Sequence, residues 1–339
     1  MSSLIALTGA TGFIGQFLLA ELPRRGYRIR VLLRRPSDMQ VQGSSAVIGD
    51  LSRPQNMGAA LRDVDAVVHS AGLSGEMTGI PEDDYRSLNT DATVNLANAA
   101  RKAGVKRFVF LSSIRAQCGP SADEVLTEQT EPRPTDAYGR SKLAAERALA
   151  ELDIDWVALR LVLVYGPGVK GNMAQLMRLA RLPYPLPLAG LDARRSLLSL
   201  HNLADAIHAA LVAPEPLRRT LLVADDTPVS VAQMIAAMRR GLGRSPLLFG
   251  MPAPVLRSSL RLIGRDELYE RLTRSLVVDC SALRRIGWRP SVETLTALTE
   301  LMPSRSHAKR DVDSGHMRTA YCGSNQRSHS TVRLGRELQ

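Results

Sequence analysis

The sequence predicts an α/β fold, built on a doubly wound parallel sheet with a smaller mixed α/β region after it. Short apolar runs alternate with longer helical patterns in the N-terminal half, and a glycine-rich turn separates the first run from the first helix. The pattern loosens into proline-rich turns beyond residue 168. We expect a Rossmann domain over residues 1–165, a smaller domain over residues 166–302 that can be interleaved with it, and a disordered basic tail over residues 303–339.

The individual elements follow from the spacing of the apolar residues. Strands are expected at residues 4–7, 28–33, 46–48, 66–69, 107–111 and 156–164. Helices are expected at residues 13–24, 55–61, 85–103 and 138–152. Gly26 and Gly104 stand just past two of these helices, where a left-handed residue commonly ends a helix. The regular alternation of strand and helix favours parallel strands.

The chain is basic, with 44 Lys and Arg against 33 Asp and Glu and a net charge of +11. Only five of the basic residues are lysines, and the arginines are scattered. Aromatic residues make up 4% of the chain, too few for a base-stacking surface, so no nucleic-acid partner is expected. The tail carries part of the excess charge.

Other features of the composition exclude several protein classes. No apolar run approaches the ~20 residues of a membrane span, so a cytoplasmic location is the expectation. The three cysteines, Cys118, Cys280 and Cys322, have no metal-ligand spacing and are expected to be buried free thiols. We therefore expect no metal site and no disulfide framework.

A glycine run follows the first expected strand and opens the first helix. It reads Thr-Gly-Ala-Thr-Gly-Phe-Ile-Gly over residues 8–15. Gly9 suits a tight turn, Gly12 a close approach of the backbone to a pyrophosphate, and Gly15 close packing of the helix on the strand. The start of the helix offers free N–H groups to phosphates. The residues predicted to bind a dinucleotide here are Gly9, Thr11, Gly12, Phe13, Ile14 and Gly15.

The ends of the second and third strands bear on which dinucleotide is bound. In such folds an acid at the end of the second strand binds the ribose 2′-OH of NAD, whereas an arginine accommodates the 2′-phosphate of NADP. Arg34 and Arg35 stand there, which favours NADP over NAD, although Arg34 could also be a solvated strand end. Asp50 and Leu51, after the third strand, are expected near the adenine ring, and Asp50 alternatively caps a helix.

Tyr138 and Lys142 lie four residues apart at the start of a predicted helix, which places them on one face. A nearby ammonium stabilises a phenolate and lowers the tyrosine pKa from its usual value near ~10. The pair can therefore exchange a proton with a carbinol or a carbonyl group. The scarcity of lysine makes a chance match at this spacing rare.

Several segments together resemble the extended short-chain dehydrogenase/reductase family, in its NAD-dependent epimerase/dehydratase branch. Besides residues 8–15, they are VVHSAG at 67–72, FLSS at 110–113, YGRSK at 138–142 and LRLVLVYGPG at 159–168. The resemblance covers about residues 3–300. It implies that Tyr138 is the general acid/base and that Lys142 holds the nicotinamide ribose.

The resemblance also implies further site residues. Ser113 would hydrogen-bond the reacting oxygen. Many members have this residue five positions before a glycine, where this chain has Ile114 before Gly119, so Ser113 implies a loop that differs by one residue, and Ser112 is a weaker candidate. The other residues that match the family are Ala71, Gly72 and Asn89 near the cofactor, and Asn172 and Arg195 near the substrate. Arginine suits the bidentate binding of a diphosphate.

The function implied is oxidation or reduction at C4 of a nucleotide-linked sugar, by a UDP-hexose 4-epimerase or a 4-keto-sugar reductase, and the resemblance implies a homodimer. No Thr-Asp-Glu run follows Leu111, so a 4,6-dehydratase is not expected. One alternative is an NADPH-dependent carbonyl or steroid-type reductase of the same superfamily. The other is a non-catalytic dinucleotide-binding subunit, which would typically lack the Tyr138 and Lys142 pair.

Overall fold

The computed structural model of the chain describes residues 2–36, 43–53, 55–75, 79–262, 264, 269 and 272–303. Of the tail expected over residues 303–339, only Pro303 is among them. No helix in the described part of the chain is both long and apolar enough to cross a membrane.

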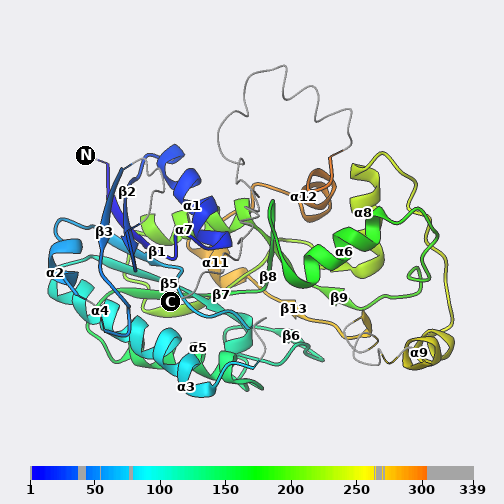
Figure 1. Cartoon of the computed structure of the whole chain (residues 1–339), viewed down its shortest axis with the longest axis horizontal. Coiled ribbons are helices and arrows are strands. Elements are labelled where there is room, and N and C mark those ends of the chain that lie inside the picture. Colours follow the sequence, from blue (N-terminus) through cyan, green and yellow to red (C-terminus); the bar gives the residue numbers. More distant parts are fainter. Residues whose placement is uncertain are drawn as a thin grey trace, which may run out of the picture. The chain divides into compact units, whose positions relative to one another are not determined.

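A seven-stranded parallel sheet forms the centre of the fold (Figure 1), which confirms the predicted fold class. Its strands are β1 (Leu4–Thr8), β2 (Arg28–Leu33), β3 (Gly43–Val47), β4 (Ala66–His69), β5 (Arg107–Ser113), β7 (Trp156–Leu161) and β11 (Arg219–Val223). They lie in the order β3-β2-β1-β4-β5-β7-β11, with every pair parallel. The strand order reverses between β1 and β4, which is where ligands bind in sheets of this kind.

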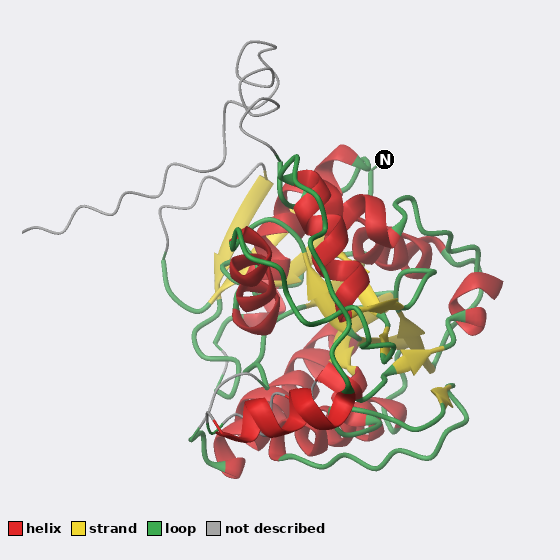
Figure 2. Ribbon diagram, turned by 90° about the vertical axis from the view of Figure 1, so that its right-hand side faces the viewer, coloured by secondary structure: helices red, strands yellow, loops and turns green. Residues whose placement is uncertain are grey.

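Helices cover both faces of this sheet (Figure 2). They are α1 (Phe13–Arg24), α2 (Met57–Ala60), α3 (Glu82–Tyr85), the π-helical η1 (Arg86–Asp91), α4 (Ala92–Lys102), the 3-10 turn η2 (Ile114–Ala116), α5 (Ala137–Ala150), α7 (Leu200–Val212) and α11 (Ser281–Arg285). Because both faces are covered, successive residues of one strand enter different cores. Ile5 and Leu7 join one buried cluster, and Leu4 and Ala6 join the other.

A third apolar cluster lies among the helices of the C-terminal part. These are α6 (Gly171–Arg181), α8 (Val231–Gly241), α9 (Ala253–Leu262) and α12 (Thr294–Glu300). Short strand pairs accompany them: β8 (Leu163–Tyr165) with β10 (Leu197–Ser199), β9 (Arg194–Arg195) with β12 (Val229–Ser230), and β6 (Val125–Leu126) with β13 (Val277–Val278). Since β11 and α7 return to the main sheet, the chain after residue 165 contributes to both regions.

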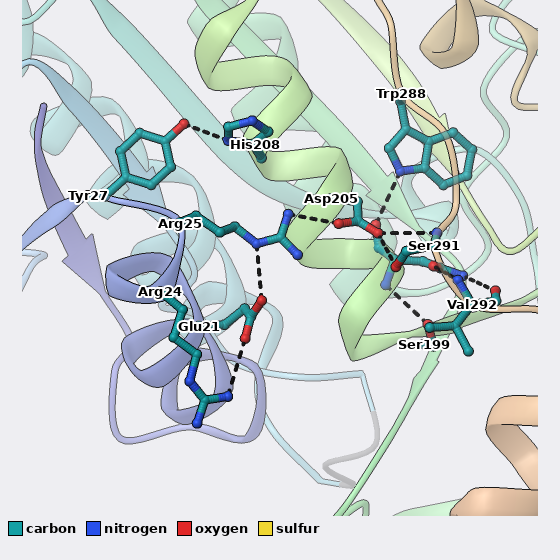
Figure 3. Close-up of polar contacts among 11 residues, drawn as sticks. Glu21, Arg24, Arg25, Tyr27, Ser199, Asp205, His208, Trp288, Ser291 and Val292 are labelled. Carbon is teal, nitrogen blue, oxygen red and sulfur yellow. Dashed lines mark hydrogen bonds and ion pairs between the residues drawn. The ribbon is translucent and has the colours of Figure 1, made fainter. Parts of the chain in front are cut away.

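Polar contacts attach α7 and the segment after α11 to α1 (Figure 3). Arg25, just past α1, pairs with Asp205 of α7 at 2.7 Å. The Tyr27 hydroxyl lies 2.8 Å from His208 Nδ1, and the Ser291 hydroxyl donates to Asp205 at 2.6 Å. Residues 86 to 181 positions apart are thereby held together.

Four elements differ most from those expected, whereas β1, β5 and α5 differ only by one or two residues at their ends. The third strand covers residues 43–47 instead of 46–48, where Gly43 allows the close approach of β2: an added Cβ would lie 2.2 Å from the Ile29 carbonyl oxygen. The helix expected at 55–61 is only the single turn α2. The helix expected at 85–103 contains the π-helical turn η1. The strand expected at 156–164 divides after Leu161, because β8 pairs with β10 instead of the main sheet.

Cys118 and Cys280 are buried free thiols, as expected, and Cys322 lies outside the described residues. Burial raises the pKa of Cys118 to about 11 and that of Cys280 to about 12. Both side chains therefore stay protonated at neutral pH, and neither has the thiolate character of a reactive cysteine.

Candidate active site

The glycine run forms a tight turn between β1 and α1. Gly9 has φ +70°, a conformation that favours glycine, and its carbonyl oxygen accepts from the Gly12 N–H at 2.9 Å. A Cβ on Gly15 would lie 2.0 Å from that same oxygen. No side chain caps α1 at Gly12, and Phe13 and Ile14 form its first, half-buried residues. The helix start therefore presents its backbone N–H groups, with exposed Thr11 beside them.

A buried hydrogen-bond chain joins this loop to the end of β4. The Thr8 hydroxyl accepts from the N–H groups of Ser70 and Ala71, each at 3.2 Å, and lies 2.7 Å from His69 Nδ1. His69 Nε2 lies 3.0 Å from the Thr93 hydroxyl, which donates to the Asn89 carbonyl oxygen. Because the Thr93 hydroxyl proton is donated to Asn89, Thr93 must accept a hydrogen bond from His69 Nε2–H. The other ring nitrogen, Nδ1, then carries no proton and accepts from the Thr8 hydroxyl.

The neutral state of His69 is consistent with this chain. Burial, together with the charge of Lys142, lowers the pKa of His69 to about 3. The ring therefore keeps one proton, on Nε2, throughout the physiological range. Sequence reasoning quoted His69 within the VVHSAG segment but assigned it no role, because its partners lie on two other elements.

Asn89 is fully buried in the π-helical turn η1. Its Oδ1 accepts from the Leu73 N–H at 2.8 Å, and its Nδ2 donates to the Ser141 hydroxyl at 3.0 Å. The amide thus ties the loop after β4 to helix α5. A Cβ on Gly72 would lie 2.7 Å from Asn89 Oδ1 and 3.5 Å from Lys142 Nζ, so these three residues are brought together. Single π-helical turns occur frequently at functional sites.

Tyr138 and Ser113 meet where β5 ends and α5 begins. Asp136 caps α5 by accepting from the Gly139 N–H at 2.7 Å, which fixes the first turn that carries Tyr138. Burial raises the pKa of Tyr138, and a side-chain hydrogen bond with Ser113 opposes that shift. The Tyr138 ring packs edge-on to Tyr85, with centroids 6.1 Å apart, and a Cβ on Gly75 would lie 2.7 Å from Tyr138 Cδ1. Sequence reasoning did not identify these two neighbours.

Ser112 lies on the opposite face of β5 from Ser113. Its hydroxyl donates to the Glu146 carboxylate of α5, which is also bound by the guanidinium of Arg160 at 2.6 Å. Both members of this ion pair are buried. The alternation of side chains along a strand therefore directs Ser112 into a structural network and leaves Ser113 with Tyr138.

Lys142 lies one turn after Tyr138 and is buried. Its Nζ donates to the Leu111 carbonyl oxygen at 3.0 Å and lies 4.6 Å from the centre of the Phe110 ring. Burial lowers the pKa of Lys142 to about 8, and the Glu146 carboxylate opposes this shift. Lys142 is therefore mostly an ammonium at neutral pH, but it loses its proton only about one pH unit higher.

The lowered pKa of Lys142 has a measurable effect on stability. Between pH 8 and 10.5 the unfolded chain keeps a proton that the folded protein has released. The contribution of Lys142 to the free energy of unfolding should therefore rise with pH across this window, by up to about 1.4 kcal/mol per pH unit. Urea unfolding of wild type and of Lys142→Met at pH values below and above 8 measures this contribution. The unfolding free energy of wild type minus that of the variant should increase with pH. A difference that is constant with pH would contradict the buried ammonium.

The residues expected near the adenosine half lie at the ends of β2 and β3. Arg34 is exposed, and its charge contributes to a lowered pKa of Asp50, which places the two groups near each other. The main cause of the lowered pKa is the hydrogen bond that the Ser52 N–H donates to Asp50 Oδ1 at 2.8 Å. Leu51 packs against the buried cluster behind the sheet. Asp50 thus forms a local turn, and its carboxylate stays ionised.

The two expected substrate residues lie in the C-terminal part. Asn172 is exposed at the start of α6, and Arg195 is half-buried on β9. The Arg195 guanidinium donates to the Pro120 carbonyl oxygen at 3.3 Å, in the loop that follows η2. No group of metal-ligating side chains gathers among the residues that the structure describes.

The chain is similar to proteins of known families. The NAD-dependent epimerase/dehydratase family model matches residues 5–223. A UDP-glucose 4-epimerase of Vibrio cholerae is 34% identical over 303 residues, which cover 86% of this chain and 92% of that protein. A 3 beta-hydroxysteroid dehydrogenase/Delta 5→4-isomerase of Mycobacterium tuberculosis is 27% identical over 339 residues, covering 88% and 89%.

The solved structures include close matches to the fold. MoeE5 in complex with UDP-glucose and NAD has a TM-score of 0.67 at 27% identity, and the match covers 91% of this chain and 99% of that one. The family model spans more than half of the chain, and the resemblance found in the sequence is confirmed. This protein belongs to the NAD-dependent epimerase/dehydratase family.

Proposed function

We propose that this protein oxidises or reduces C4 of a nucleotide-linked hexose, as a 4-epimerase or a 4-keto-sugar reductase. The observation that carries the proposal is that Ser113, at the end of β5, hydrogen-bonds Tyr138 one helical turn before Lys142, whose Nζ would lie 3.5 Å from a Cβ on Gly72. The likeness to a UDP-glucose 4-epimerase and to MoeE5, solved with UDP-glucose and NAD, supports the substrate class.

The residues of the glycine loop fit a dinucleotide. The loop is drawn in so closely that a Cβ at Gly9 or Gly15 would meet backbone atoms at 2.7 Å or less, which leaves the N–H groups at the start of α1 open to a pyrophosphate. Lys142 would hold the nicotinamide half, and the buried Asn89 would fix the loop beside it through Leu73. Arg34 would bind a 2′-phosphate if the cofactor is NADP. When bound, the nicotinamide supplies hydride chemistry.

The residues of the chain would manage the proton. Tyr138 would take the proton of the sugar hydroxyl during oxidation and return it during reduction. The charge of Arg115 lowers the pKa of Tyr138, and the Lys142 ammonium, one turn away, would also favour the phenolate that this exchange requires. Ser113 would donate to the same sugar oxygen and stabilise the charge that develops there. In the free protein, burial raises the pKa of Tyr138, so bound groups are needed to lower it.

The C-terminal part would supply the substrate contacts. We propose that residues 166–302, apart from α7 and β11 in the main sheet region, form the substrate-binding domain, with Arg195 on the diphosphate and Asn172 as a second contact. The bond from Arg195 to the Pro120 carbonyl oxygen lies in the loop that follows β5 and η2, which supports a position next to the catalytic residues. Guanidinium is suited to this bidentate role.

A reductase for an apolar ketone is the second candidate. It is supported by the steroid dehydrogenase of Mycobacterium tuberculosis, which matches this chain over 88% of its length. Ser113, Tyr138 and Lys142 would do the same proton chemistry there, so the site alone favours neither substrate. The two candidates differ in whether a nucleotide diphosphate is required.

A set of parallel incubations separates these functions. Purified protein is mixed with UDP-hexoses and UDP-N-acetylhexosamines without added cofactor, and C4 inversion is followed by NMR. Parallel samples receive a 4-keto sugar nucleotide, or a steroid ketone, with NADH or NADPH. We expect one of two results. A 4-epimerase inverts C4 of a UDP-sugar with the cofactor it already holds, whereas a 4-keto-sugar reductase acts on the keto sugar only when NADPH is present and consumed. Turnover of the steroid ketone alone would overturn the sugar assignment in favour of the second candidate.

A further inference from the structure

The exposed apolar side chains of this protein are gathered in one region. The described part of the chain exposes nine large hydrophobic residues, and six of them fall within residues 182–184, 247–249 and α9. Leu182, Tyr184, Leu247 and Phe249 are 43, 68, 47 and 44% exposed. The segment from α8 to α9 (yellow in Figure 1) runs along the border of the ribbon opposite to β3. We call Leu182, Tyr184, Leu247 and Phe249 the apolar edge.

Arg239 of α8 joins the two segments that carry the apolar edge. Its side chain is buried, and all five of its N–H groups are directed at backbone oxygens. The acceptors are the carbonyl oxygens of Ala180, Leu182, Tyr184, Pro246 and Leu247, at 2.6–3.3 Å. The Leu186 N–H donates to Leu247 and the Phe249 N–H to Leu186, both at 3.0 Å. The edge is therefore a fixed feature of the fold.

The same region is positively charged. Residues 171–191 and 229–264 contain seven arginines and no aspartate or glutamate. Arg181 and Arg244 are exposed next to the apolar edge, and Arg244 lines a surface pocket of about 390 Å³ together with Leu182 and Leu247. The charge of Arg240 is opposed by that of Glu293, the residue that caps α12.

Helix α9 continues this surface. It packs through Leu256 into the cluster that also holds Leu186 and Leu248, which are neighbours of the apolar edge in sequence. Its Val255 is 50% and its Leu262 88% exposed. Arg257 and Arg261 of the same helix are exposed as well. A helix that lies on a membrane surface combines exposed apolar groups with arginine or lysine on a neighbouring face, and α9 carries both kinds of residue.

The geometry points to a docking surface for an anionic lipid bilayer, made of the apolar edge with Arg181 and Arg244 and extended by α9. Arginines would bind the lipid phosphates, and the leucine, tyrosine and phenylalanine side chains would enter the interface between headgroups and acyl chains. Nucleic acid fits less well, because exposed leucine and valine gain nothing from a phosphate backbone. A second copy of this chain would bring arginine against arginine.

Vesicle co-sedimentation tests this surface on the full-length protein. Vesicles of phosphatidylcholine alone are compared with vesicles that also contain phosphatidylglycerol. We expect binding to the anionic vesicles only, weakened at high salt. The charge variant Arg181→Glu/Arg244→Glu and the apolar variant Leu247→Ser/Phe249→Ser should each reduce the partition coefficient by about tenfold or more.

Two matched controls separate the surface from net charge and general stickiness. Arg101→Glu/Lys102→Glu on α4 makes the same change of charge, and Val125→Ser/Val212→Ser removes apolar groups that are 55 and 56% exposed. Both controls should bind like wild type, and thermal unfolding establishes that all variants are folded. Equal losses in controls and edge variants would overturn the proposal. So would absence of vesicle binding, binding to duplex DNA instead, or a dimer that only the edge variants dissociate.

Discussion

Tyr138→Phe should remove nearly all turnover while leaving cofactor binding intact. The substitution removes only the phenolic hydroxyl, which exchanges the proton in the proposed reaction and which hydrogen-bonds Ser113. General acid–base groups contribute typically 10²–10⁴-fold, so we expect kcat to fall by about 10³-fold. The ring still packs against Tyr85 and Gly75, so folding and NAD binding should persist. Steady-state kinetics and titration with NAD measure the two effects separately.

Tyr85→Phe is the matched control. It removes a hydroxyl that donates to the Ser74 carbonyl oxygen at 3.2 Å, from a ring 6.1 Å away from that of Tyr138. Since we assign no proton transfer to Tyr85, its kcat should stay within about a few-fold of wild type, a small part of the effect of a general acid. A Tyr138→Phe enzyme that keeps its kcat would refute the assignment of the general acid/base, whatever the substrate.

Gly15→Ala should prevent the tight binding of a dinucleotide and lower stability. The added methyl group would lie 2.0 Å from the Gly9 carbonyl oxygen and 2.6 Å from the Gly9 carbonyl carbon. Both atoms belong to the backbone of the loop, so α1 must move away from β1 or the turn must open. We expect the unfolding free energy to fall by about 1–3 kcal/mol, the usual cost of overpacking. The Kd for NAD should rise by at least about tenfold, since the N–H groups lose their alignment.

Gly58→Ala tests whether this effect is local to the loop. Gly58 lies in helix α2, and a Cβ there would have no heavy atom within 4 Å. Alanine in a helix is more favourable than glycine, so stability should be unchanged or higher by up to about 1 kcal/mol. Isothermal titration with NAD and urea unfolding apply to both variants. NAD binding by Gly15→Ala at the affinity of wild type would show that the loop does not hold the pyrophosphate.

The parallel sheet was predictable because its signal is local. Residues 4–7 are a continuous apolar run, and the second segment is apolar at residue 29 and over residues 31–33, which suits strands whose two faces are largely buried. The glycines at 9, 12 and 15 have their spacing fixed by the turn itself, so position along the chain was enough to assign them. Prediction was less accurate where the pairing partner of a strand determines its boundaries. The strand expected at 156–164 ends at Leu161, because the following residues pair with β10, more than thirty residues away.

The choice between Ser112 and Ser113 shows the same limit within the site. In sequence the two serines differ by one position, and family spacing left both open. The structure directs Ser112 to Glu146 and Ser113 to Tyr138, because adjacent residues of a strand point to opposite faces. The register of β5 against its neighbours therefore decides which serine is available to a substrate.

Taken by itself, the sequence determined the fold class, the family, the phosphate loop and the spacing of Tyr138 and Lys142, since each of these depends on residues that are neighbours in the chain. The tertiary structure decided what lies around them. The hydrogen-bond chain through His69, the ammonium of Lys142 with its pKa lowered to about 8, and the apolar edge held by Arg239 all join distant elements. Burial and hydrogen-bond partners are properties of the packed chain, and they determine charge states and exposed surfaces that no local pattern contains.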